Sequence, residues 1–174
     1  MIADNAAFAG LVRRYQGMVY SIAWNYLHNR ASAEEIAQEA FLELHRRLDR
    51  IESEEHAMRF LRKVTAHRSV DEGRRTRHWP RVGLDDVREP GAMPKLKDPK
   101  LDEALGRLVA SLPDRARMLV VLRYQEDMEP GEIASALDVP LGTVKSGLHR
   151  ALAVLRKRME RTRKGVLECR TSNG

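Results

Sequence analysis

Six histidines and their neighbouring carboxylates are the residues of this sequence that could carry acid-base or metal chemistry. Four of them recur every eleven residues: His45, His56, His67 and His78. On one helix that spacing is about 16 Å of rise, whereas the ligands of one zinc ion lie about 2 Å from the metal, so the four cannot share an ion. His67 and Asp71 have the spacing of an acid-base pair, but neither a nucleophile motif nor a glycine-rich phosphate loop accompanies them. The pattern therefore favours a protein that is not an enzyme and holds no metal or cofactor.

The polar residues between 141 and 150 point to a different chemistry, the binding of DNA. In a predicted helix over 141–164, four apolar side chains fall within about 80° of arc and form a stripe to be buried. They are Val144, Leu148, Leu152 and Leu155. The opposite side is small and polar near its start, where it carries Thr143, Ser146, Gly147 and Arg150. Hydroxyls and arginine bond base edges in the major groove. Lys145 and His149 flank the stripe, where they would reach phosphates.

A short helix over 130–137 and a tight break are predicted to position this longer helix, as in a helix-turn-helix. Ala134 is small where two helices must cross, and Val139 can fill the turn. A plain helical hairpin would explain the same apolar positions. It would not explain why the polar face is uncharged at its tip and strongly basic further along, at Arg150, Arg156, Lys157, Arg158, Arg161, Arg163 and Lys164.

The rest of the chain also has helical periodicity. Proline is absent before Pro80, and apolar residues keep three- and four-residue steps over 11–26 and 36–48. Ser32 and Glu35 have the form of a capping box, which predicts a helix from Ser32 to Leu48. Further helices are predicted over 54–77, 99–110 and 113–126. The fold class is therefore all-α: two small helical domains (1–80 and 100–165) joined by a flexible linker (81–99), the second containing the helix-turn-helix, with a tail over 166–174.

Composition restricts the partners and the compartment. Thirty-one Lys and Arg against 25 Asp and Glu give a formal net charge of +6, so a polyanion is favoured over a cation. Cys169 is the single cysteine, so no intrachain disulfide can form. The start has no basic segment before its short apolar run, and no stretch approaches the roughly 18 apolar residues of a membrane span. We therefore expect a cytoplasmic protein without membrane insertion.

Three segments together resemble a known family. Residues 112–152, LPDRARMLVVLRYQEDMEPGEIASALDVPLGTVKSGLHRAL, are similar to region four of bacterial sigma factors, specifically of the extracytoplasmic-function (ECF) group. Residues 33–49, AEEIAQEAFLELHRRLD, resemble the region two helix that docks on RNA polymerase, and residues 60–78, FLRKVTAHRSVDEGRRTRH, resemble the adjoining promoter-melting helix. The segments stand in the family's order, with no room for the middle domain of larger sigma factors.

The resemblance implies a sigma factor that binds core RNA polymerase and directs promoter-specific transcription initiation. The first domain would dock on polymerase and open the minus-ten element, and the second would read the minus-thirty-five element. Core RNA polymerase and promoter DNA are the implied partners, with no small-molecule substrate. An anti-sigma factor is an expectation from the family alone. The alternative is a stand-alone helix-turn-helix regulator that binds DNA as a homodimer; it would bind its operator without polymerase.

Site residues follow from the resemblance, position by position. The polymerase-docking surface is carried by Glu35, Gln38, Glu39 and Leu42. The downstream element would be bound by His67, Arg68, Asp71, Arg74, Arg75 and Arg77, with His67 and Asp71 at the positions that read a flipped base. The upstream element would be bound by Thr143, Lys145, Ser146, His149 and Arg150. Two positions depart from the family, which often has asparagine at His67 and usually arginine at Gly147. We expect the preferred downstream base to change and upstream affinity to be weakened or shifted in sequence.

Overall fold

A computed structural model describes residues 2–77 and 99–171, with side chains for residues 6–76 and 105–161. The helices are α1 (Ile2–Leu27), α2 (Arg30–Arg46), the short 3-10 helix η1 (Leu48–Arg50), α3 (Glu54–Arg77), α4 (Pro99–Ala110), α5 (Asp114–Tyr124), α6 (Pro130–Leu137) and α7 (Leu141–Thr171). The described residues contain no strand, and the predicted all-α class is confirmed. Among the described helices, none has the length and apolar character needed to cross a membrane. The predicted linker lies almost wholly outside the described residues.

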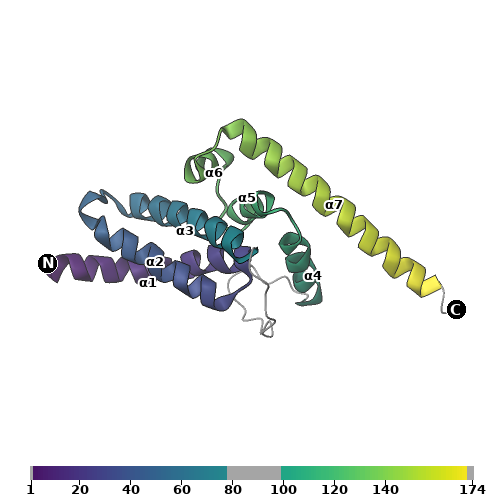
Figure 1. Ribbon diagram of the computed structural model, residues 1–174, viewed down its shortest axis with the longest axis horizontal. Coiled ribbons are helices and arrows are strands. Elements are labelled where there is room, and N and C mark those ends of the chain that lie inside the picture. The colour runs from purple at the N-terminus through teal and green to yellow at the C-terminus, as the bar shows by residue number, and fades with distance from the viewer. Residues whose placement is uncertain (1, 78–98, 172–174) are drawn as a thin grey trace.

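Helices α1, α2 and α3 form the first unit, and they lie along one another in Figure 1. Their shared core includes Val19 of α1, Leu44 of α2 and Leu61 of α3, all fully buried. Val19 and Leu44 belong to the apolar series that predicted the first two helices. Three- and four-residue steps place such side chains on one side of each helix, which is the side that packs inward.

The start of α2 differs from the prediction. The helix begins at Arg30, and its N-cap is Asn29, whose side chain accepts a hydrogen bond from the backbone N–H of Ser32 at 2.9 Å. His28 before it has φ of 50°, so the chain turns sharply there and leaves Asn29 extended at the helix entrance. The predicted capping box of Ser32 and Glu35 is therefore wrong. The hydroxyl of Ser32 instead lies 3.5 Å from Glu72 on α3.

Helices α4 to α7 form the second unit, with α5 at its centre. Five consecutive residues of α5 are buried, from Met118 to Leu122, because α5 contacts helices on several sides, including α1, α3, α6 and α7. Helix α7 is longer than the predicted span to residue 164 and runs to Thr171. In Figure 1 it extends well past α4 and α5 toward the C-terminus.

The two units pack against each other and share an apolar core. One buried cluster contains Ile22 and Ala66 of the first unit together with Leu122, Ile133 and Val144 of the second. Helix α6 contacts α3, and α5 contacts both α1 and α3. Figure 1 shows α5 and α6 lying over the α1–α3 layer. The sequence predicted two domains, but it did not predict that they would be in contact.

Candidate nucleic-acid interface

The turn between α6 and α7 is built by local chemistry. Glu129 caps α6 in a reciprocal capping box with Glu132, whose carboxylate accepts from the Glu129 backbone N–H at 2.7 Å, and Pro130 opens the helix. Asp138 ends α6 with φ of 52°, in the left-handed region that Asp and Asn tolerate better than most residues. The Val139 backbone N–H then donates to the Ala134 carbonyl at 3.1 Å. This stops α6 and lets α7 start at Leu141, which confirms the predicted helix, break and longer helix.

The buried side of α7 faces α5 and α6. Its buried residues are Val144, Leu148, Ala151 and Leu155. Leu152, predicted to be buried, is only half-buried. Ala151 is buried instead, in the same cluster as Leu112 and Val120.

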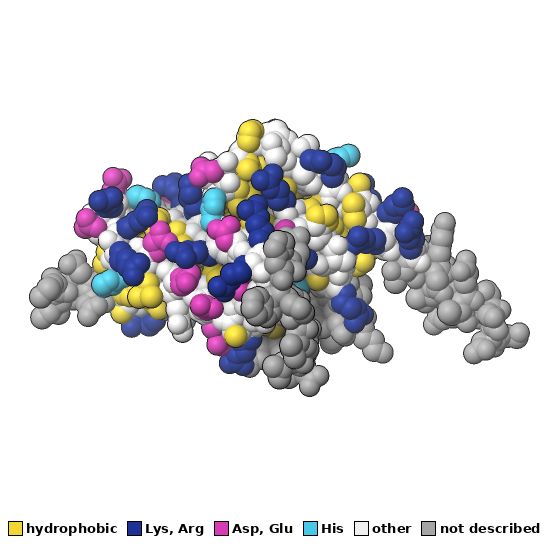
Figure 2. Space-filling model, in the orientation of Figure 1, with side chains coloured by type: hydrophobic (Ala, Val, Ile, Leu, Met, Phe, Trp, Pro, Cys, Tyr) yellow, Lys and Arg dark blue, Asp and Glu magenta, His cyan; other side chains and the backbone are white. Residues whose placement is uncertain are grey.

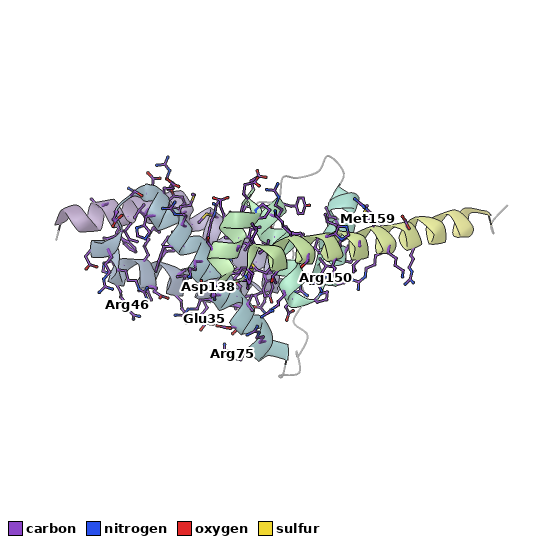
Figure 3. The ribbon with its side chains drawn as sticks, turned by 90° about the horizontal axis from the view of Figure 1, so that it is seen from above. Glu35, Arg46, Arg75, Asp138, Arg150 and Met159 are labelled. Atoms are coloured by element: carbon purple, nitrogen blue, oxygen red, sulfur yellow. The ribbon has the colours of Figure 1, made fainter. Side chains whose placement is uncertain are left out.

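The predicted upstream-element side of α7 is open to solvent. Its exposed members are Thr143, Lys145, Ser146, His149 and Arg150. The Ser146 hydroxyl donates to the Thr143 carbonyl at 3.2 Å, and Arg150 Nε donates to the Ser146 carbonyl at 3.2 Å, so local bonds orient both side chains. Figure 3 shows Arg150 on α7, well apart from Arg46 on α2. This face of α7 is therefore accessible to a DNA duplex.

Cations continue along α7 beyond this face. Lys145, Arg156, Lys157 and Arg161 are exposed and form no ion pair within the described part of the chain. Arg158 differs, because its guanidinium donates to the Ser111 carbonyl at 3.0 Å. In Figure 2 the dark blue side chains of this helix have few magenta neighbours, whereas the two colours are mixed over the α2–α3 region. Unpaired exposed cations are suited to phosphate contacts.

Gly147 does not lie on the exposed face of α7 alone. A Cβ atom added there would be 2.5 Å from Cδ1 of Leu119 on α5, so the glycine lets α5 and α7 approach closely. The prediction that Gly147 lies on the exposed side is therefore wrong in part, because the residue is half-buried against α5. A side chain at this position must first displace Leu119.

On α3, the predicted base-reading residue His67 contacts the second unit. Its Nε2 lies 2.9 Å from the Ala136 carbonyl, and since a carbonyl only accepts, Nε2 is the donor. Asp71, one turn later, is exposed, and Arg74 Nη1 lies 3.8 Å from its carboxylate. Arg75 pairs with Glu72 at 2.8 Å. Figure 3 places Arg75 near the end of α3.

Arg68 and Arg77 complete the predicted downstream set. Arg68 is paired with two carboxylates of α2, Glu39 at 2.9 Å and Glu43 at 3.3 Å. The side chain of Arg77 lies outside the described residues. Arg68 and Arg75 are thus paired with carboxylates at 2.8 to 3.3 Å, whereas Arg74 is more than half exposed and has only the distant Asp71 carboxylate beside it.

The predicted polymerase-docking residues share one edge of α2. Glu35, Gln38 and Leu42 are exposed, and Leu42 is 56% exposed although it is a large apolar side chain. Glu39 is less exposed because it meets Arg68. This edge thus combines acidic and amide side chains with one exposed apolar side chain, Leu42.

Several residues at the junction of the two units were not predicted to have a role. Arg62 donates to the Glu126 carbonyl at 3.1 Å, and Lys63 pairs with Asp138 at 2.9 Å. Burial raises the pKa of the Glu126 carboxyl to about 7; Asp127 also raises it, and the Arg62 guanidinium partly opposes the shift. These contacts join positions 64 and 75 residues apart, and no local sequence pattern reveals such pairs.

The two predicted DNA-binding faces meet at a single groove. It has a volume of about 590 Å³, and its lining includes His67, Asp71 and Arg74 from α3 and Thr143 and Arg150 from α7. Its floor is apolar, with Leu119 and Val144 among the residues. Residues predicted to bind two separate promoter elements are therefore neighbours in this conformation.

Comparisons with known proteins match both units. The family model for sigma-70 region 2 matches residues 11–78, and that for sigma-70 region 4 matches residues 102–155. The ECF RNA polymerase sigma factor SigW of Bacillus subtilis (strain 168) is 28% identical over 172 residues, covering 90% of each chain. The ECF RNA polymerase sigma-E factor of Escherichia coli (strain K12) is 29% identical over 161 residues, covering 85% of this chain and 84% of that one.

Solved structures share the fold. CnrH in complex with the cytosolic domain of CnrY aligns with a TM-score of 0.66 at 18% identity, over 90% of this chain and 89% of that one. The sigma factor RpoE in complex with the anti-sigma factor NepR, from Bartonella quintana, also aligns with a TM-score of 0.66, at 16% identity, over 88% and 97% of the two chains. With both regions matched in order and relatives aligned along nearly their whole length, the chain belongs to the sigma-70 family, as an ECF sigma factor that directs transcription initiation at promoters.

Proposed function

We propose that this sigma factor docks on core RNA polymerase through the α2 edge of Glu35, Gln38, Glu39 and Leu42, and reads the upstream promoter element with the exposed face of α7. The proposal for the upstream element rests on the solvent-exposed side of α7. There, Thr143, Ser146 and Arg150 lie beside cations that form no ion pair in the described part of the chain. Hydroxyls and a guanidinium suit base edges, while Lys145 and Lys157 suit phosphates. Helix α3 would bind the downstream element, and His67 and Asp71 would contact the displaced base.

Reading both elements at once requires the two units to separate. Elements centred roughly 25 base pairs apart lie about 85 Å apart along a duplex that rises roughly 3.4 Å per base pair. The groove of about 590 Å³ holds His67 and Arg150 on a common lining, so one duplex cannot present both elements to them there. The conformation described here is therefore a closed one. Polymerase binding would favour an open one, with residues 78–98 joining the units.

The proposed role in promoter recognition does not require a catalytic residue in this chain. The pairing of His67 with a backbone carbonyl gives it a structural bond, and Asp71 stands exposed with Arg74 as its nearest cation. Bond formation in transcription is left to polymerase. An anti-sigma factor is a further proposed partner, supported by the structural similarity to the sigma factor RpoE in complex with the anti-sigma factor NepR.

Reconstituted transcription tests the proposal. The chain is mixed with bacterial core polymerase and a pool of random promoter sequences, and transcripts are sequenced. We expect transcripts that begin downstream of a shared two-part motif. Leu42→Asp should abolish transcription and polymerase co-purification, whereas Arg46→Gln, an exposed change at the end of α2, should preserve both. Specific duplex binding by the free chain as a homodimer, with no polymerase association, would instead establish the stand-alone regulator.

A further inference from the structure

Arg68 lies between α3 and two acidic residues of α2. Its Nη1 is 2.9 Å from Glu39 Oε2, and its Nη2 is 3.3 Å from Glu43 Oε2. The second oxygen of Glu43 is 3.1 Å from Arg47 Nη2. The guanidinium of Arg68 therefore uses both terminal nitrogens on carboxylates one turn apart, and a four-residue chain runs from Arg47 through Glu43 and Arg68 to Glu39.

The acidic residues of α2 need such a cation. Glu35, Glu39 and Glu43 follow one another at four-residue steps, so their carboxylates lie along one line of the helix. Like charges at this spacing destabilise a helix, and each prefers to turn away from the next. Arg68 supplies positive charge between Glu39 and Glu43, and its planar fork fixes the direction of both carboxylates.

Glu39 is at the same time a member of the proposed docking surface. Glu35, Gln38 and Leu42 are exposed beside it on α2, while Glu39 is drawn toward α3 by Arg68. Arg74 provides the contrast on α3. It has one carboxylate nearby, Asp71 at 3.8 Å, and both side chains are more than half exposed, so the guanidinium is available to a phosphate.

Resting on the proposed function, we infer that Arg68 is a positioning residue of the polymerase-docking surface and is not a ligand of the downstream DNA strand. It sets the orientation of Glu39 and Glu43 and holds α2 against α3. This changes the role that the family resemblance implied for Arg68, and leaves Arg74 as a DNA-contacting residue of the same helix.

The test compares Arg68→Gln with the matched control Arg74→Gln in the full chain. Two affinities are measured for each: that of the chain for core polymerase, and that of the holoenzyme, formed at saturating polymerase, for a single-stranded promoter oligonucleotide. Arg68→Gln removes both ion pairs that orient Glu39 and Glu43, so it should weaken polymerase binding about threefold to tenfold and leave oligonucleotide affinity and its salt slope unchanged. Arg74→Gln should do the reverse.

A second variant and a double-mutant cycle distinguish a specific effect of Arg68 from a general loss of folding. Arg68→Lys keeps the positive charge but lacks the two terminal nitrogens of the guanidinium. Its polymerase affinity should therefore lie between those of Arg68→Gln and the unaltered chain. In a double-mutant cycle, Glu43→Gln and Arg68→Gln should be non-additive in polymerase affinity. Loss of oligonucleotide affinity on replacing Arg68, or additivity in the cycle, overturns the inference. If the unaltered chain fails to bind polymerase, the proposed function fails instead.

Discussion

His67 Nε2 lies 2.9 Å from the carbonyl oxygen of Ala136, so the proposed base-reading residue of α3 is bonded to the helix that opens the helix-turn-helix. Around this bond, Lys63 pairs with Asp138 and Arg62 donates to the Glu126 carbonyl. The same face of α3 cannot hold α6 and a DNA base together. With the role proposed for His67, closure of the two units and reading of the downstream element are mutually exclusive.

Separation of the units should be visible as a change in one distance. Arg59 on α3 and Ser135 on α6 are exposed and face a common cavity between the units. Spin labels on Arg59→Cys and Ser135→Cys, in a Cys169→Ser background, should give a short distance in the free chain. Adding core polymerase and promoter DNA should lengthen it by tens of ångströms in a pulsed dipolar measurement.

A label pair within the first unit is the control for that measurement. Arg13→Cys on α1 and Arg59→Cys on α3 are both exposed, and their distance should stay constant. If the distance across the cavity also remains short in the transcribing complex, the closed arrangement is the active one and the mutual exclusion described above is wrong.

Arg150 and Lys157 should differ in what they do for upstream-element binding. Arg150→Gln removes a side chain placed for base edges, so it should cost about 1 to 3 kcal/mol on preferred sequences and much less on others. Lys157→Gln removes a proposed phosphate contact, so it should weaken all sequences similarly and reduce the salt slope by about 0.9. Binding of holoenzyme to a panel of duplexes at several salt concentrations separates the two. Equal losses on every sequence for both variants would contradict these roles.

Gly147 should resist substitution for a packing reason. Gly147→Ala places a Cβ 2.5 Å from Leu119 Cδ1. Overpacking of this kind costs typically about 1 to 3 kcal/mol, against about 1 kcal/mol gained from the helix preference for alanine. We expect net destabilisation of about 1 kcal/mol in urea unfolding. Gly142→Ala on the same helix meets nothing within 4 Å and serves as the control, with no loss expected.

The double variant Gly147→Ala with Leu119→Ala then identifies the cause. Removal of the Leu119 side chain should make the added methyl group at position 147 harmless, so the two changes should be strongly non-additive. The same clash predicts that Gly147→Arg first perturbs the α5–α7 contact. A gain in upstream affinity with unchanged stability would mean that only the DNA contact matters there.

Glu126 should make stability depend on pH. Burial raises its pKa from 4.5 to about 7, so the folded chain binds this proton more tightly than the unfolded chain does. Stability should therefore fall as pH rises from about 5 to about 7 and level off above, by about 1 to 3 kcal/mol. Glu126→Gln keeps the shape without the charge, so it should be more stable than the parent at pH 8 and equal to it near pH 4.5. Urea unfolding at both pH values checks this, and an identical pH profile for the two chains would refute it.

Regular helices could be predicted wherever the sequence carries local signals. The bounds of α3 and α6 match the prediction, because apolar spacing runs through α3 and Pro130 opens α6. The start of α2 was misplaced, because Asn29 and Ser32 are both good capping residues and the choice depends on the turn at His28. Periodicity correctly predicted that Thr143, Ser146 and Arg150 of α7 are exposed, but it misplaced Gly147, which is half-buried against Leu119 of α5.

The partners of the site residues could not be predicted. Arg68 meets Glu39 and Glu43 from 29 and 25 residues away, and His67 meets Ala136 from 69 residues away. Such pairs depend on how helices cross, and a cationic residue on a helix reads the same in sequence whether a carboxylate or a phosphate faces it. The assignment of Arg68 to DNA followed from family position and missed its acidic neighbours.

Helix α7 has 31 residues, which at about 1.5 Å per residue makes a continuous rod about 46 Å long. Its first turns are fixed in the helix-turn-helix, while Figure 1 shows its last turns reaching past the other helices. A rotation of α7 by about 20° about its N-terminal end would therefore move its C-terminal end by about 16 Å. Small tilts of α7 at its base would thus become large displacements of its last turns.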